Sequence, residues 1–218
     1  MKAVSKINLL IFIVLIGVAW GCKENQNQDS LPYYTTPDFT PRWQADLDKP
    51  VKKLHRIAPF KFTNQLGQKV ANQDLAGKIY VANFFFTTCP SICPKMTTNL
   101  FAVQEAFAKD QAIKLVSYSV MPWFDSVSML KKYAAKNHVD SEKWHLLTGE
   151  KEKIYEIARQ SYFAEKGIGL TKSSNEFLHT ENVFLIDGEG HIRGVYNGTL
   201  PLEMKRLIED IKILKQSS

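Results

Sequence analysis

The sequence predicts an α/β fold in which helices flank a mixed central sheet and an added N-terminal β-hairpin precedes it. Residues 79–86 are a run of apolar and aromatic side chains, typical of a central strand buried on both faces, and residues 113–120 form the next buried strand. Between and after these strands, apolar side chains recur at helical spacing. Strands that alternate with helices imply parallel βαβ units covered by helices.

The individual elements follow from local signals in chain order. An alternating stretch that begins near residue 57 and a turn at 64–67 predict the hairpin. Pro94 suits the first position of a helix that continues to about residue 108. The remaining predictions are helices at 126–137, 151–163 and 201–214, a strand at 143–147, and a second hairpin at 183–196. That hairpin makes part of the sheet antiparallel, so the order of strands and helices predicts a thioredoxin-like fold. We expect this fold to form one domain over residues 55–218.

The first 22 residues have the features of an export signal. Lys2 and Lys6 precede the apolar stretch 7–19, which is shorter than the roughly 20 residues that span a bilayer. Residues 19–22, Ala-Trp-Gly-Cys, resemble a bacterial lipoprotein processing site, at which Cys22 is lipidated and begins the mature chain. We therefore expect an extracytoplasmic domain held by a lipid anchor on the periplasmic side of a bacterial membrane. An uncleaved N-terminal anchor is the alternative.

Residues 23–54 are polar and interrupted by four prolines, with no helical or strand period, which predicts a flexible linker between anchor and domain. The formal net charge of +6 is a mild basic excess. The basic–aromatic pattern of nucleic-acid modules is missing from the sequence, so we expect no nucleic-acid partner. We expect a monomer.

Cys89 and Cys93 are the strongest chemical signal. If Cys22 carries lipid, they are the only thiols of the folded domain. They follow a buried strand and open a helix, where open α/β sheets place ligand sites and where the helix start lowers a thiol pKa. Three intervening residues let both sulfurs reach one ion or each other. Thiolates suit Cu(I) and zinc, so the pair alone supports metal binding and redox chemistry about equally.

His179 favours the metal. It precedes the strand predicted at 183–186, and in a thioredoxin-like sheet that entry loop lies beside the cysteine loop. Thiol oxidoreductases of this fold usually carry a cis-proline there, whereas this chain has no proline between Pro122 and Pro201. His179 would supply a third ligand. The other histidines, which show no partner spacing, are interpreted as surface residues: His55, His138, His145 and His191.

Together these segments resemble the Sco/SenC family of copper chaperones over roughly residues 55–215. The matching segments are TTCPSICPKM at 87–96, LHTENVFLID at 178–187 and the hairpin at 188–198. The resemblance implies that Cys89, Cys93 and His179 bind Cu(I) and Cu(II). It also implies a part in maturing the binuclear copper site of cytochrome c oxidase, with an oxidase subunit or another copper protein as the partner.

The chain departs from the family pattern at two acidic positions. Ser91 stands where the family usually has an acid inside the cysteine loop, and Met121 replaces the Asp of an Asp-Pro pair. Asp125 matches the second Asp of that stretch. Met121 and Asp125 are therefore candidate auxiliary contacts to copper, and ordinary packing within the loop is the favoured alternative for Met121.

The favoured interpretation is a metallochaperone rather than an enzyme. The main alternative is an extracytoplasmic thiol–disulfide oxidoreductase that keeps oxidase-subunit cysteines reduced. It would use Cys89 and Cys93 as a redox-active pair that forms a disulfide, and it would not need His179. A membrane-anchored sensor that uses copper as a signal is a third hypothesis.

Overall fold

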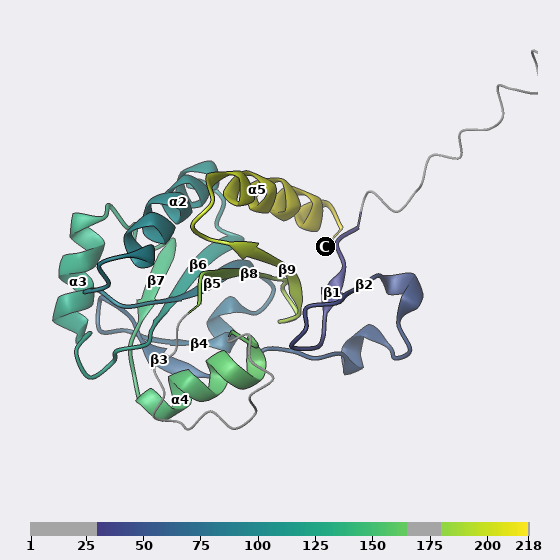
Figure 1. Ribbon diagram of the computed structural model, residues 1–218, viewed down its shortest axis with the longest axis horizontal. Coiled ribbons are helices and arrows are strands. Elements are labelled where there is room, and N and C mark those ends of the chain that lie inside the picture. Colours follow the sequence, from purple (N-terminus) through teal and green to yellow (C-terminus); the bar gives the residue numbers. More distant parts are fainter. Residues whose placement is uncertain (1–29, 165–179, 218) are drawn as a thin grey trace, which may run out of the picture. The chain divides into compact units, whose positions relative to one another are not determined.

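A computed structural model describes residues 30–164 and 180–217, and from Leu31 onward these belong to one compact unit (Figure 1). The predicted fold is confirmed. A seven-stranded mixed sheet has the strand order β2-β1-β9-β8-β5-β6-β7, and a separate two-stranded hairpin pairs β3 with β4. Among the described residues, no helix combines the length and apolar character needed to cross a membrane.

The centre of the sheet is parallel. β5 (Ile79–Phe85) pairs with β6 (Ile113–Ser119) over seven residues, and β7 (Trp144–Leu147) extends the parallel pairing beyond β6. The helices α2 (Ile92–Ala106) and α3 (Val127–Lys136) form the connections between these strands. Because parallel neighbours run in the same direction, the loops after β5 and β6 lie at one edge of the sheet.

The second half of the sheet is antiparallel. The start of β8 and the end of β9 lie at the edge where the loops after β5 and β6 lie. β8 (Asn182–Ile186) runs against β5, and β9 (Ile192–Asn197) runs against β8. The pairing of Asn83 with Val183 places the beginning of β8 beside the end of β5. The last helix, α5 (Pro201–Gln216), begins at a proline and follows β9.

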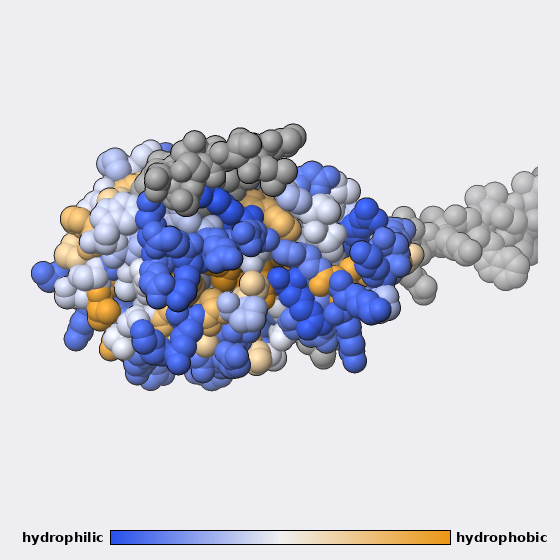
Figure 2. Space-filling model, turned by 90° about the horizontal axis from the view of Figure 1, so that it is seen from below, coloured by the Kyte–Doolittle hydropathy of each residue, from blue (hydrophilic) through white to orange (hydrophobic). Residues whose placement is uncertain are grey.

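Two hydrophobic clusters cover the two faces of the sheet. One packs α2, α3 and α5 against the sheet, and the other packs the hairpin and α4 (Lys151–Glu156) against the opposite face (Figure 1). Figure 2 views the molecule from below and shows a largely hydrophilic surface with scattered hydrophobic patches. A groove between the hairpin and α4 is lined by residues that include Phe60, Phe62 and Lys153. No residue of the cysteine loop lines this groove.

The hairpin forms where the turn signal predicted it. β3 (Lys61–Thr63) pairs with β4 (Lys69–Ala71). Asn64 is fully buried, and its side-chain oxygen accepts hydrogen bonds from the backbone N–H groups of Leu66 and Gln68, each at 2.9 Å. Gly67 has φ of +77°, a conformation that glycine adopts without steric cost.

The helix predicted at 151–163 changes its geometry halfway. After α4 the chain continues as a π-helical turn, η4 (Ile157–Ser161), in which the Tyr162 N–H donates to the Ile157 carbonyl at 3.1 Å. Tyr162 is fully buried. Its hydroxyl lies 3.2 Å from that of Tyr80 and 3.1 Å from that of Tyr118, so the wide turn brings a third tyrosine into a buried hydrogen-bonded cluster.

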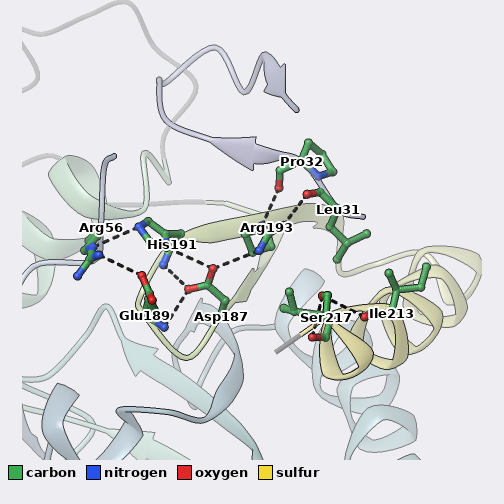
Figure 3. Close-up of polar contacts among 10 residues, drawn as sticks. Leu31, Pro32, Arg56, Asp187, Glu189, His191, Arg193, Ile213 and Ser217 are labelled. Atoms are coloured by element: carbon green, nitrogen blue, oxygen red, sulfur yellow. Dashed lines mark hydrogen bonds and ion pairs between the residues drawn. The ribbon is translucent and has the colours of Figure 1, made fainter. Parts of the chain in front are cut away.

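The prediction of a flexible linker is wrong for residues 31–42. The short strands β1 (Tyr33–Tyr34) and β2 (Pro41–Arg42) extend the sheet beyond β9. Arg193 explains the attachment (Figure 3): its guanidinium donates to the carbonyls of Pro32, at 3.0 Å, and Leu31, at 2.5 Å. It also lies 3.9 Å from the centre of the Tyr33 ring.

His191 corrects the expectation that the four remaining histidines are surface residues. Its side chain is only 1% exposed, and it contacts Asp187 and Arg56 (Figure 3). The Arg56 Nε donates to His191 Nε2, so the other ring nitrogen carries the proton donated to Asp187. His138 is exposed as expected, whereas His55 and His145 are half-buried.

Candidate metal centre

Cys89 and Cys93 lie together after β5. Cys89 is half-buried in the loop, and Cys93 is 4% exposed in the first turn of α2. The helix begins at Ile92, two residues before the proline predicted to open it. Backbone N–H groups of this first turn have no partner within the helix and point toward the loop, so they are available to the Cys89 sulfur. No disulfide joins the two sulfurs in this structure.

The two thiols differ in acidity. Burial disfavours the Cys89 thiolate, but hydrogen bonds from the Cys93 thiol and from the backbone of Ser91, Cys93 and Ile92 outweigh it, so the pKa of Cys89 is lowered. Burial and the hydrogen bond to Cys89 raise the pKa of Cys93 to about 12. Cys89 is therefore the more acidic thiol of the pair, and its sulfur accepts a hydrogen bond from the buried Cys93 thiol.

We predict that this asymmetry governs reactivity in the reduced, metal-free protein. At neutral pH, limiting iodoacetamide is expected to alkylate Cys89 at least about tenfold faster than Cys93, because the thiolate is the nucleophile. Peptide mass spectrometry after short reaction times measures both rates. In urea the two rates should converge, and equal rates in the folded protein would contradict the assigned acidities.

Asp125 lies beneath the cysteine loop. It is fully buried, and its carboxylate accepts from the Thr87 hydroxyl at 2.5 Å, from the Thr87 N–H at 3.1 Å and from the Ser119 hydroxyl at 2.5 Å. Because both carboxylate oxygens already have donors, this geometry favours support of the loop over the direct contact with copper considered from the sequence.

Met121 lies in the turn after β6 and is half-buried. Its carbonyl accepts from the N–H groups of Phe124, at 2.9 Å, and Asp125, at 2.8 Å. Its own N–H donates to the Ser119 hydroxyl at 3.1 Å. Asp125 thus closes the turn that carries Met121 as well as holding the cysteine loop.

The other predicted site residues, Cys22 and His179, lie outside the described residues. Description resumes at Thr180, two residues before β8, whose first residues lie beside the end of β5. Within residues 30–164 and 180–217, no group of three or more His, Cys, Asp and Glu side chains gathers to hold a metal ion. The described part of the chain therefore supplies two sulfur donors.

The comparisons with known proteins assign the family. The family model SCO1/SenC matches residues 49–216. The chain belongs to the SCO1/SenC family. The resemblance drawn from the cysteine and histidine segments is thereby confirmed.

Solved structures of SCO1/SenC proteins share the fold. A SCO1/SenC family lipoprotein from Bacillus anthracis str. Ames is 31% identical, with a TM-score of 0.65, over 78% of this chain and 99% of that one. BsSco, described as a Sco family cytochrome c oxidase assembly protein with a disulfide switch, is 28% identical, with a TM-score of 0.62, over 75% and 95%. Bradyrhizobium japonicum ScoI with copper bound is 25% identical, with a TM-score of 0.58, over 72% and 98%.

Proposed function

We propose that this SCO1/SenC protein is a membrane-tethered copper metallochaperone that helps to mature the binuclear copper site of a cytochrome c oxidase. The observation that carries the proposal is the hydrogen-bonded Cys89–Cys93 pair at the sheet edge where β5 ends. Two relatives support it: Bradyrhizobium ScoI has been solved with copper bound, and BsSco is described as an oxidase assembly protein. The partner would be an oxidase subunit or another copper protein, and the chaperone would act as a monomer.

The donor set suits copper as cargo. Two thiolates are soft ligands for Cu(I), and the imidazole of His179 would add a donor that suits Cu(II). Because ligands must be deprotonated, binding displaces the proton of Cys93. Cys89 is only half-buried, which leaves one side of the pair open to a ligand from a partner and permits transfer by ligand exchange.

Copper titration of the reduced protein tests this function. We expect one ion per chain and a strong thiolate-to-Cu(II) charge-transfer band. Cys89→Ser or Cys93→Ser should abolish the band, and His179→Ala should weaken retention of Cu(II) by about tenfold or more, as for loss of one ligand. Unchanged stoichiometry in His179→Ala and in both serine variants would sink the proposal.

A thiol–disulfide oxidoreductase is the second candidate function. The lowered pKa of Cys89 beside a buried thiol is the arrangement of an attacking and a resolving cysteine. His179→Ala distinguishes the two functions, because it should leave reductase activity intact while copper retention falls. If His179→Ala instead lost reductase activity and kept its copper, the result would contradict both a copper ligand at His179 and a chaperone role.

We also propose that Cys22 carries the lipid that holds the protein on the periplasmic side of the membrane. The Bacillus anthracis relative is described as a lipoprotein. Cys22→Ser should abolish incorporation of labelled palmitate. The signal peptide should then stay uncleaved, so that the protein has a higher mass than the processed form. Palmitate labelling that survives the substitution would contradict lipidation at this residue.

A further inference from the structure

Asp125 is a buried carboxylate whose partners in the described structure are all neutral. It is 0% exposed, and its donors are the Thr87 N–H and the hydroxyls of Thr87 and Ser119. No ion pair joins it to a Lys, Arg or His of residues 30–164 and 180–217. Asp187, the other buried aspartate of this part of the chain, contacts both Arg193 and His191. Asp125 is therefore a buried carboxylate that is held by uncharged donors alone and is paired with no cation of the described residues.

The donors of Asp125 come from two neighbouring strands. Thr87 follows the end of β5 and lies two residues before Cys89, and Ser119 is the last residue of β6. Backbone pairing continues as far as the Val120 N–H, which donates to the Phe85 carbonyl at 2.8 Å. Beyond that point the carboxylate of Asp125 links the segment after β5 to the end of β6, through Thr87 and Ser119. It thus fixes the place where the cysteine loop leaves the sheet.

The charge of Asp125 lies near the two thiols. Burial raises the pKa of Tyr133, the hydrogen bond with Thr97 lowers it, and the ionised forms of three neighbours would each raise it further. These neighbours are Cys93, Cys89 and Asp125. All three therefore act on one hydroxyl, which is hydrogen-bonded to Thr97 of α2 at 2.8 Å. Coulomb energy scales with the product of the charges, so a fixed carboxylate stabilises a nearby doubly charged cation twice as much as a singly charged one.

We propose that Asp125 is a positioning residue of the metal centre: without touching the ion, its carboxylate holds the Cys89 loop against the turn after β6, and its charge favours Cu(II) over Cu(I). This inference rests on the proposed function. It also assigns a role to the one acid retained in a stretch where the usual Asp is replaced by Met121.

The test compares Asp125→Asn with Asp187→Asn in the full mature chain. Both substitutions are isosteric, remove one buried charge and destabilise the fold, but only the first lies beneath the cysteine loop. Competition with chelators for Cu(II) and for Cu(I) gives both affinities. For Asp125→Asn we expect Cu(II) affinity to fall about tenfold and Cu(I) affinity about threefold, the square root expected from the charges. Asp187→Asn should change neither.

Two further variants separate geometry from charge. Thr87→Val and Ser119→Ala keep the carboxylate but each remove a donor to it. They should shift the thiolate-to-Cu(II) charge-transfer band, while the ratio of Cu(II) to Cu(I) affinity changes less than in Asp125→Asn. If Asp125→Asn does not fold, these variants still carry the test of positioning, and an unshifted band in both would overturn it.

The outcomes distinguish this inference from the proposed function. A wild-type protein that binds no copper overturns both. A second outcome is that the wild type binds copper normally, while the affinities for Cu(II) and Cu(I) fall by the same factor in Asp125→Asn as in Asp187→Asn. This outcome overturns only the role of Asp125, because equal losses report a general loss of stability.

Discussion

Oxidation of the Cys89–Cys93 pair to a disulfide is expected to abolish copper binding, and reduction is expected to restore it. The two thiols already share a hydrogen bond, so little movement is needed to form an S–S bond. Oxidation removes two electrons and two protons and leaves sulfurs that are poor copper ligands. Within residues 30–164 and 180–217, no group of three or more His, Cys, Asp and Glu side chains offers a second metal site.

The measurement is a copper titration of one preparation before and after treatment with diamide, and again after dithiothreitol. We expect one ion per chain, then none, then one. Cys93→Ser is the matched control, because it cannot form this disulfide and whatever weak binding it keeps should be insensitive to diamide. Full copper loading of protein shown by mass spectrometry to be oxidised would contradict redox gating. BsSco is itself described as having a disulfide switch.

Much of the sheet was predictable because its central strands have a purely local signal. The runs 79–86 and 113–120 became β5 and β6 with ends that differ by one residue, and the last helix begins at Pro201 as expected. β1 and β2 were missed because two-residue strands have no period. Their attachment depends on Arg193, which is 161 residues away from Pro32 along the chain. The π-helical turn at Ile157 likewise has no local signal.

The candidate site divides in the same way. The cysteine pair was predictable from its spacing and its place after a buried strand. The supporting role of Asp125 was not, since it depends on Thr87 and Ser119, which come from different strands. A signal was nonetheless present: Thr87 and Ser119 are polar residues at the ends of two neighbouring parallel strands, and such ends meet at one edge of the sheet.

Asp187→Asn is expected to lower the free energy of unfolding by about 3 kcal/mol at pH 7, the size typical of breaking a buried ion pair. Asp187 accepts from the His191 N–H at 2.9 Å and contacts the Arg193 guanidinium at 3.3 Å (Figure 3). The amide would leave Arg193, which is 9% exposed, without an opposite charge. Since Arg193 also holds Leu31 and Pro32, the attachment of β1 should loosen with it.

The effect should depend on pH with a definite sign. Burial alone would raise the pKa of Asp187, but the hydrogen bonds from His191 and the charge of Arg193 lower it overall. A carboxyl whose pKa is lower in the folded state contributes stability above its unfolded pKa of about 3.9 and loses it as pH falls through the folded value. The difference between wild type and Asp187→Asn should therefore be full at pH 7 and shrink below about pH 4.

Urea denaturation followed by tryptophan fluorescence measures both the size and the pH dependence. Glu189→Gln is the matched control, because it removes a carboxylate from the same hairpin turn. Glu189 is exposed in its ion pair with Arg56, with side-chain exposures of 57% and 39%, so this variant should cost less than about 1 kcal/mol. If Glu189→Gln destabilised the protein as much as Asp187→Asn, or if the cost of Asp187→Asn stayed constant down to pH 3, burial of the Asp187 charge would not be the source of the stability.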